Sequence, residues 1–354
     1  MASDFLLYGA TGFVGAAAAR LAVRMGLRPV LAGRDAAKLE PLAAELGVDF
    51  RVFGLDDPGA MDGALGSVPV VLHCAGPYGA TAIPMLEACF RTRTHYLDLT
   101  GELPVLESLA SREAEARARG IMLLPAVGFD VVPTDCLAVH LHHRLRSATR
   151  LTLAFHSDGP AGFPPGTQRT AIDLVPFGNR IRRDGRLVVP RRTPPFRTID
   201  FGQGPRLARW LLWGDLFTAF RSTGIPDIDD YAVQPDAARR LVALAALLRP
   251  LFRLNAVRRF AGLAVTPGPT PEQCARTVTH VWGEAVDADG RKAVARLHGP
   301  EAGLVWTTRA ALAVVRNVLA GHAPVGFQTP GLAYGADFVL ECEGVTREDV
   351  PTEA

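Results

Sequence analysis

The chain has 354 residues, of which 48% are hydrophobic and 21% charged, and its formal net charge is +2. This length predicts two domains, and the composition is typical of a soluble globular protein. So small a net charge gives no support for a nucleic-acid partner. The five cysteines contain no CxxC pair, so we expect neither a disulfide framework nor a bound metal.

The N-terminal sequence and the longest apolar stretch both argue against a membrane-spanning chain. The N-terminal sequence MASDFLLYGATG has no basic region before its apolar run, which predicts no signal peptide. The longest apolar stretch, residues 241–252, is interrupted by Arg249 and Pro250 and is too short to cross a bilayer. Together with the cysteine pattern, this predicts a cytoplasmic protein.

The first 126 residues alternate short apolar runs with helical patterns. We expect strands at residues 4–8, 29–34, 49–53, 69–74, 95–98 and 121–126, and helices at 16–26, 36–47, 58–66, 80–91 and 105–119. This alternation predicts right-handed βαβ crossovers and a parallel sheet. The fold class is therefore α/β, with a Rossmann-type domain over residues 1–148.

The pattern changes near residue 150. Strands are expected at 149–156, 186–189, 196–201, 276–287 and 291–297 without regular intervening helices, and Asp289-Gly290 predicts a hairpin between the last two. Residues 149–300 are therefore expected to form a second, α+β domain on a mixed or antiparallel sheet. The amphipathic helix at 301–320 leads us to expect residues 301–354 to pack back onto the first domain.

The segment GATGFVG follows the first strand and opens the first helix. It comprises Gly9, Ala10, Thr11, Gly12, Phe13, Val14 and Gly15. Gly9 permits a tight turn, Gly12 lets the backbone approach a pyrophosphate, and Gly15 lets the helix pack on the strand. The helix N-terminus then offers N–H groups and a positive dipole to phosphates. This arrangement predicts a dinucleotide site.

The end of the second strand bears on the choice of cofactor. An NAD site usually has an acidic residue about 20 positions after the glycines, whereas this chain has Gly33 and then Arg34. A guanidinium pairs well with a 2′-phosphate, so we expect NADP(H). Asp35 comes next, and it leaves NAD open.

A third loop is expected along the same cofactor. The fourth strand runs into Cys74, Ala75, Gly76, Pro77 and Tyr78. Loops at the carboxyl ends of parallel strands face the ligand crevice, so this turn of small residues is expected to contact the dinucleotide.

Several stretches together resemble the saccharopine dehydrogenase-like superfamily, including its trans-acting enoyl reductase branch. They are GATGFVG at 9–15, AGR at 32–34, CAGPY at 74–78, HYLDLTGE at 95–102 and GFDVVPTD at 128–135. The resemblance covers about the first 140 residues well and the rest in outline. It implies a Rossmann domain, an α+β substrate domain and NADPH as hydride donor, and it leaves the substrate open. Short-chain dehydrogenase chemistry is excluded, because no tyrosine has a lysine four residues later.

The candidates for proton transfer and substrate contact lie in loops. Tyr78 and Asp130 are the candidate proton donors, and a carboxyl donates at neutral pH only if burial raises its pKa. The candidate substrate-lining residues are Asp98, Glu102, Phe129, Asp135, Thr167 and Arg169. Each carboxylate also has a structural interpretation, as a strand-end or helix-capping residue.

Three functions remain open on this sequence. The first is an NADPH-dependent reductase of an activated C=C or C=N bond in an apolar small-molecule or carrier-bound acyl substrate. The second is a saccharopine dehydrogenase-like enzyme of secondary amines, and the third a non-catalytic NADP(H)-binding sensor or scaffold. The apolar, arginine-containing segments 207–220 and 241–264 are compatible with core, a homodimer interface, or peripheral contact with a membrane.

Overall fold

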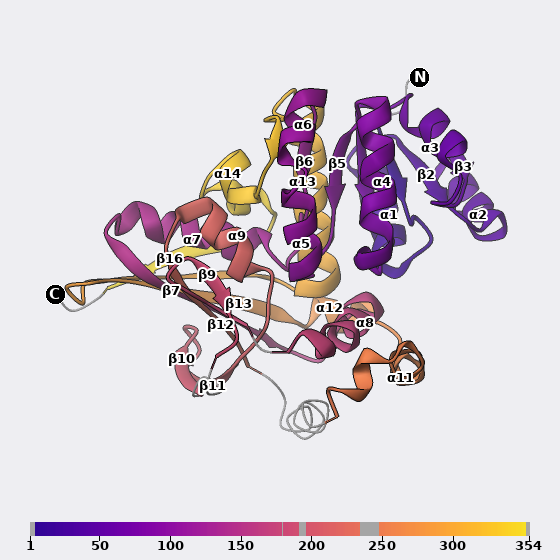
Figure 1. Ribbon diagram of the computed structural model, residues 1–354. Coiled ribbons are helices and arrows are strands. Elements are labelled where there is room, and N and C mark those ends of the chain that lie inside the picture. Colours follow the sequence, from indigo (N-terminus) through magenta and orange to yellow (C-terminus); the bar gives the residue numbers. More distant parts are fainter. Residues whose placement is uncertain (1–3, 179, 191–195, 234–247, 352–354) are drawn as a thin grey trace. The chain divides into compact units, whose positions relative to one another are not determined.

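The computed structural model describes residues 4–178, 180–190, 196–233 and 248–351 (Figure 1). The chain divides into two compact units. The first comprises residues up to Val132 together with Leu304–Ala333, and the second comprises Pro133–Gly303 together with Tyr334 onward. The first unit has a parallel sheet and the second a mixed sheet, which confirms the predicted α/β fold class.

The first unit is built on a seven-stranded sheet in the order β15-β6-β5-β4-β1-β2-β3. Every pair in it is parallel. The strands are β1 (Phe5–Tyr8), β2 (Pro29–Gly33), β3 (Phe50–Val52), β4 (Val70–His73), β5 (His95–Asp98), β6 (Met122–Leu124) and β15 (Gly326–Phe327). The strand order reverses between β1 and β4, and ligands of such sheets bind at this switch point, beyond the carboxyl ends of the strands.

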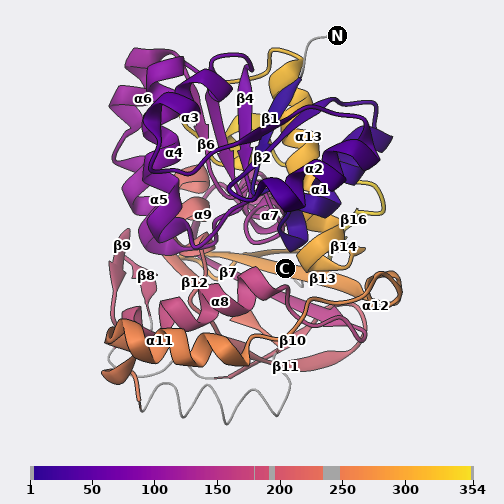
Figure 2. The same ribbon diagram turned by 90° about the vertical axis from the view of Figure 1, so that its right-hand side faces the viewer.

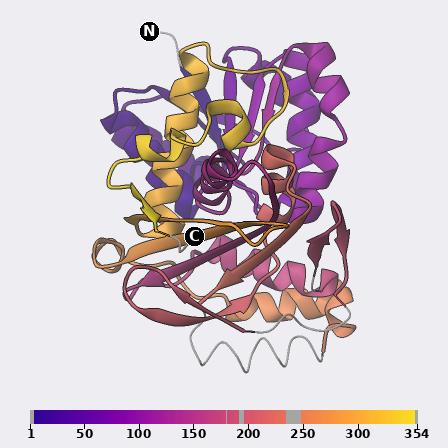
Figure 3. The same ribbon diagram turned by 90° about the vertical axis from the view of Figure 1, so that its left-hand side faces the viewer.

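Helices cover both faces of this sheet. They are α1 (Phe13–Arg24), α2 (Ala36–Leu46), α3 (Pro58–Leu65), α4 (Tyr78–Thr92), α5 (Leu103–Ala110), α6 (Glu113–Arg119) and α13 (Thr307–Leu319). Figure 2 shows α3 to α6 on one side of the strands and α1, α2 and α13 on the other. Helix α13, yellow-orange in Figure 3, contacts both α1 and β4. Strands β1, β2 and β4 are consequently buried on both faces, which explains why they read as continuous apolar runs.

The second unit has a nine-stranded sheet in the order β10-β11-β12-β7-β13-β14-β16, with β8 and β9 branching from β12. Its strands are β7 (Ala148–Asp158), β8 (Ile181–Arg183), β9 (Arg186–Val188), β10 (Arg197–Asp200), β11 (Pro205–Trp210), β12 (Asp227–Ala232), β13 (Val278–Asp287), β14 (Lys292–Pro300) and β16 (Thr346–Val350). Among the described strands of this sheet, only β12 and β7 pair in parallel. The predicted hairpin through Asp289-Gly290 is confirmed, because β13 and β14 pair antiparallel on either side of it.

Short helices connect these strands. They are α7 (Val132–Arg144), α8 (Pro165–Leu174), η1 (Val175–Phe177), α9 (Asp215–Thr223), η2 (Leu251–Arg253), α11 (Asn255–Ala261), η3 (Gly262–Ala264), α12 (Pro271–Ala275) and η5 (Phe338–Glu341). The chain crosses between the units near the start of α7, in η4 (Ala302–Trp306) and in α14 (Pro330–Tyr334).

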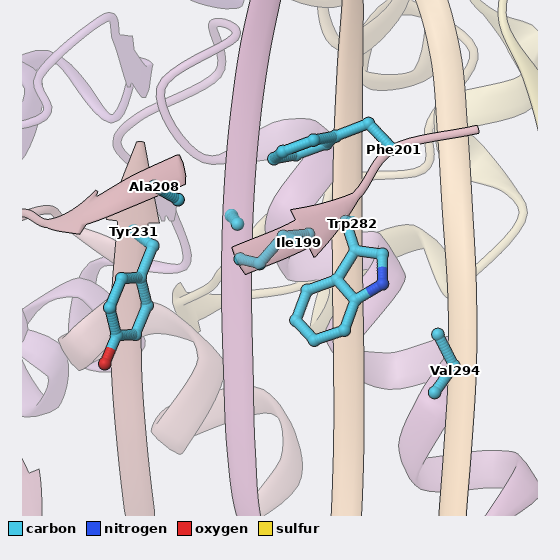
Figure 4. Close-up of a cluster of buried hydrophobic side chains, with 7 residues drawn as sticks. Ile199, Phe201, Ala208, Tyr231, Trp282 and Val294 are labelled. Carbon is cyan, nitrogen blue, oxygen red and sulfur yellow. The ribbon is translucent and has the colours of Figure 1, made fainter. Parts of the chain in front are cut away.

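One apolar cluster of the second unit lies where β10 and β11 fold over the main sheet. Phe201 and Ile199, at the end of β10, pack against Trp282 on β13 and Tyr231 on β12 (Figure 4). The guanidinium of Arg197 lies 5.0 Å from the centre of the Trp282 ring. Large apolar side chains from strands far apart in the sequence therefore share one cluster, which gives this sheet a core of its own.

Two features differ from the sequence-based expectation. The helix expected at 105–119 is two helices, α5 and α6, and Arg112 between them pairs with Glu87 on α4 and Glu115 on α6. Residues 334–354 group with the second unit rather than the first, because β16 pairs antiparallel with β14. The apolar segment 207–220 holds the end of β11 and most of α9, while residues 241–247 of the other apolar segment lie outside the described part of the chain.

Candidate functional site

The turn between β1 and α1 can be built only from glycine at two positions. Gly9 has φ of +81°, and a Cβ there would lie 2.9 Å from Ala75. A Cβ on Gly15 would lie 2.2 Å from the carbonyl oxygen of Gly9, which is closer than non-bonded atoms tolerate. The turn is further fixed by Gly9 N–H and Ala10 N–H, which donate to the Ala32 carbonyl on β2.

The N-terminus of α1 carries no side-chain cap. Its cap residue is Gly12, with no capping hydrogen bond and no acidic residue in the first turn. Thr11 and Val14 are half-buried, and Phe13 is 36% exposed. A helix start with free N–H groups and no carboxylate suits a phosphate, so the cradle fits a dinucleotide pyrophosphate.

The guanidinium of Arg34 is positioned for an anion beyond β2. Gly33 ends β2, and its carbonyl accepts from Phe53 N–H. Arg34 is exposed, and within the described part of the chain its side chain makes no hydrogen bond or ion pair. The next carboxylate, Asp35, pairs instead with Lys38 at 3.2 Å. The cation is therefore available at the place where NADP carries its 2′-phosphate.

Residues 74–78 join β4 to α4 beside the glycine turn. A cis peptide links Gly76 to Pro77, and the Cys74–Ala75 backbone lies against Gly9. Cys74 is not a reactive thiolate, because burial raises its thiol pKa to about 12. This small-residue loop therefore lies against the glycine turn, and its contact with the dinucleotide stays a prediction.

Glu102 caps α4. One carboxylate oxygen accepts from Tyr78 N–H at 3.1 Å, and the other accepts from Gly79 N–H at 3.3 Å. Helix α4 has no cap from its own N-terminal residue, Pro77, so Glu102, 24 positions after Tyr78, supplies the negative charge that the helix start favours. This contact gives Glu102 a structural role in holding α4, whereas its expected contact with substrate stays a prediction.

The Tyr78 side chain is buried, and its hydroxyl is hydrogen-bonded to the backbone. Its hydroxyl donates to the His73 carbonyl at 3.3 Å, and its ring lies edge-on to the His73 imidazole. Burial raises the phenol pKa well above its usual value. A fully protonated phenol that already donates within the protein is a poor proton donor to a ligand. This geometry weighs against Tyr78 as the acid.

Asp98 ties together two loops at the carboxyl edge of the sheet. One of its oxygens accepts from Thr100 N–H and from Ala126 N–H, both at 2.9 Å, and the other accepts from the Tyr96 hydroxyl at 2.7 Å. The side chain is fully buried, and this burial raises its pKa to about 6. Ala126 has a φ of +60°, a strained conformation that the bond to Asp98 helps to hold. Asp98 therefore fixes the loop that leads to Asp130.

Asp130 is the carboxyl at this edge with the best properties for proton transfer. It is half-buried, and burial raises its pKa to about 7. Its carboxylate lies against Gly101, where a Cβ would come within 2.8 Å of an oxygen. The adjacent Phe129 is anchored on α13, with its N–H donating to the Thr307 hydroxyl and its ring 5.3 Å from Trp306. Asp130 therefore projects from a loop held at both ends.

The remaining sequence-predicted residues have contacts within their own units. Phe129 is 5% exposed and packs in the core. Asp135, on α7 in the second unit, is fully buried and accepts from the Ser222 hydroxyl. Thr167 and Arg169 lie on α8 in the second unit, where Arg169 pairs with Asp173. Phe129 and Asp135 thus have structural contacts in their own units, while contact of Thr167 and Arg169 with substrate stays a prediction.

Sequence reasoning missed Gly101 and His73. Gly101 leaves the space that the Asp130 carboxylate occupies, and the only signal was a glycine beside a candidate acid. His73 is fully buried among the rings of Tyr8, Tyr78 and Tyr96, and burial lowers its pKa to about 3. The uncharged imidazole is part of the core under the loop.

Two kinds of feature are absent from the described residues. No group of three or more His, Cys, Asp or Glu side chains in the described part of the chain is arranged to hold a metal ion. No helix among those residues is long and apolar enough to cross a membrane.

Comparison with curated proteins shows similarity over part of the chain. A trans-acting enoyl reductase of Mycobacterium leprae (strain TN) is 37% identical over 150 residues, which is 40% of this chain and 36% of that protein. A trans-acting enoyl reductase of Mycobacterium bovis (strain BCG / Pasteur 1173P2) is 34% identical over 149 residues, with the same coverage. The matched region is thus about a third of the length of these relatives.

Two further comparisons concern family and fold. The apo saccharopine dehydrogenase (L-Glu forming) of Saccharomyces cerevisiae superposes over 99% of this chain and 100% of its own, with a TM-score of 0.67 and 15% sequence identity. At that identity the likeness concerns the fold. Residues 5–124 match the family model of the saccharopine dehydrogenase NADP binding domain, and this confirms the resemblance noted in the sequence. Over residues 5–124 the chain is therefore similar to the saccharopine dehydrogenase NADP binding domain.

Proposed function

We propose that this protein is an NADPH-dependent reductase of an activated C=C bond, with Asp130 as the proton donor. The observation that carries the proposal is a half-buried carboxyl with a pKa of about 7 at the same sheet edge as a glycine turn and a free guanidinium. The similarity to proteins named trans-acting enoyl reductases supports an enoyl substrate over an imine.

The first unit supplies binding and orientation. The uncapped start of α1 would hold the pyrophosphate through backbone N–H groups, and Arg34 would pair with the 2′-phosphate. The loop at Cys74–Tyr78, fixed by the Glu102 cap on α4, would contact the bound dinucleotide. NADPH supplies a hydride when it is bound, and the protein must orient the acceptor and deliver a proton to the second atom.

Asp130 meets the requirement for that proton. A general acid works best when its pKa lies near the operating pH, and burial brings this carboxyl to about 7. Its oxygen is held against Gly101, and its loop is anchored through Ala126 and Phe129. The protonated carboxyl donates to the substrate carbon and is reprotonated from solvent.

A binding experiment tests whether the protein prefers NADPH to NADH. Arg34→Ala should weaken NADPH about 10- to 100-fold, since a hydrogen-bonded charge pair contributes roughly 1.5–3 kcal/mol, and should change NADH binding little. Arg28→Ala is the matched control, because Arg28 is exposed directly before β2 whereas Arg34 directly follows it. Calorimetry measures both affinities. Equal losses for NADPH and NADH would contradict the assignment to NADP.

A turnover experiment tests the chemistry. NADPH oxidation is followed with enoyl thioesters, enones and cyclic imines. The wild type should reduce enoyl substrates, with a rate that falls above pH of about 7 as Asp130 loses its proton. Asp130→Asn should lower kcat about 10²- to 10⁴-fold, remove that dependence on pH and leave NADPH affinity unchanged. Asp49→Asn, at an exposed carboxylate before β3, is the control.

The outcomes separate the alternatives. Turnover of imines alone would replace the enoyl assignment with an amine-type reaction. NADPH binding without oxidation of any of these compounds would reject the reductase. An Asp130→Asn enzyme with unchanged kcat would reject Asp130 as the acid and leave the cofactor assignment intact.

A further inference from the structure

The second unit exposes a compact apolar and basic surface that the proposed reaction does not use. Seven of its large apolar side chains are more than a third exposed within two stretches, 163–177 and 248–263: Phe163, Phe177, Leu248, Leu251, Leu254, Phe260 and Leu263. Phe260 and Leu263 are 77% and 80% exposed, more than any other large apolar side chain that the structure describes.

The two stretches belong together in space. Helix α11 contacts α8 and both η2 and η3, and η1 contacts both α8 and η2. Figures 1 and 2 both show α11, in orange, running beside α8. The side chain of Arg249 fastens the stretches to each other, because it donates to the carbonyls of Pro176 and Phe177 at 3.2 Å. We call the surface formed by η2, α11 and η3 the α11 surface.

The charge on the α11 surface has one sign. Residues 248–271 contain four arginines and no aspartate, glutamate or lysine. Arg258 pairs with Asp173, the acid of α8, at 3.5 Å, and Asp173 also pairs with Arg169. Arg253 and Arg259 are exposed, and neither forms an ion pair or a side-chain hydrogen bond within the described residues. The surface therefore presents phenylalanine and leucine next to uncompensated positive charge.

This combination of exposed apolar side chains and arginines favours an anionic membrane over a second copy of the chain as the partner. A two-fold contact between copies of the chain brings the same patch against itself, so Arg253 and Arg259 of both copies would meet without a carboxylate in the patch to oppose them. An anionic bilayer offers what the surface needs: phosphate oxygens for the guanidinium groups and an apolar layer just beneath for Phe260 and Leu263.

We propose that the α11 surface docks this protein on a membrane that contains anionic phospholipid. Leu254, Phe260 and Leu263 enter the boundary between headgroups and acyl chains, while Arg253 and Arg259 stay at the level of the phosphates. Contact is peripheral and reversible, because α11 has only seven residues, Asn255–Ala261.

Vesicle flotation of the full chain tests the proposal. The wild type should float with vesicles of phosphatidylcholine containing phosphatidylglycerol, and much less with phosphatidylcholine alone. Arg253→Glu with Arg259→Glu should reduce binding at least about 25-fold, because each arginine near an anionic surface contributes about fivefold in affinity and reversal adds repulsion. Phe260→Ser with Leu263→Ser should abolish flotation. Raising the salt concentration should weaken wild-type binding.

A matched control and a local probe keep the test specific. Arg206 and Leu207 lie exposed on β11, so Arg206→Glu with Leu207→Ser makes the same chemical changes elsewhere and should float as the wild type does. In Phe260→Trp, indole emission should shift to shorter wavelength with the anionic vesicles and be quenched by brominated lipid.

Three results would overturn the proposal. One is a wild type that ignores both kinds of vesicle, and another is undiminished flotation of the two α11 double variants. The third is a concentration-dependent dimer, seen by light scattering, that Phe260→Ser with Leu263→Ser dissociates, since the surface would then join two copies of the chain.

Discussion

Substitution of Asp98 should show how strongly one buried carboxyl holds the candidate site together. Asp98→Ala leaves three donors without an acceptor: Thr100 N–H, Ala126 N–H and the Tyr96 hydroxyl. Each buried donor left unsatisfied costs about 1–3 kcal/mol. Relaxation of the loop recovers some of this cost, so we expect a loss of about 3–6 kcal/mol in the stability of the first unit.

Asp98→Asn should behave quite differently. The amide oxygen can still accept from both N–H groups, and the amide nitrogen can donate to the Tyr96 oxygen. At neutral pH the wild type holds an ionised carboxylate in a buried site, where its pKa is raised from 3.8 to about 6. A folded pKa above the unfolded one means that stability falls as pH rises between the two values, here by about 3 kcal/mol in total.

The pH dependence is therefore the deciding measurement. About half of the fall in stability, roughly 1.5 kcal/mol, occurs between pH 5 and pH 8. This dependence of stability on pH should vanish in Asp98→Asn. Urea unfolding with hydrogen exchange of peptides from β5 and β6 reports on this unit separately from the other. The Asp98 carboxyl does not hold this loop as described if Asp98→Asn keeps the wild-type dependence of stability on pH, or if Asp98→Ala is as stable as Asp98→Asn.

Two further outcomes follow from close contacts. Gly15→Ala places a methyl group 2.2 Å from the Gly9 carbonyl oxygen, so NADPH binding should weaken at least about tenfold and stability should drop about 1–3 kcal/mol, whereas Gly63→Ala, with nothing within 4 Å, should be harmless in both assays. His280 and His298 share a 2.7 Å contact between Nδ1 atoms, and burial, with the neighbouring histidines, lowers the His280 pKa below its usual 6.5. The second unit should therefore lose stability as pH falls below about 6.5. If hydrogen-exchange rates in β13 depend on pH equally in the wild type and in His298→Leu, this histidine pair is excluded as the cause.

Local sequence determined the architecture of the first unit. Apolar runs four or five residues long, separated by helical patterns, predict a parallel sheet, because only strands buried on both faces can be continuously apolar. Local sequence likewise predicts the dinucleotide turn, from the glycine spacing in residues 9–15, and its preference for NADP over NAD, from the arginine at position 34. Both predictions are possible because steric limits and charge are properties of the residues themselves. The hairpin at Asp289-Gly290 was predictable for the same local reason.

Contacts between distant residues decided the rest. Nothing near Glu102 in the sequence indicates that its carboxylate caps α4, or that Gly101 leaves room for Asp130. The pairing of β16 with β14, which assigns the last residues to the second unit, depends on a neighbour about 50 positions away. Propensity and periodicity act over a few residues, whereas burial, pKa and the partner of a polar group depend on what the folded chain brings against it. Tertiary structure alone therefore distinguished Tyr78, whose phenol is used within the protein, from Asp130, whose pKa suits proton transfer.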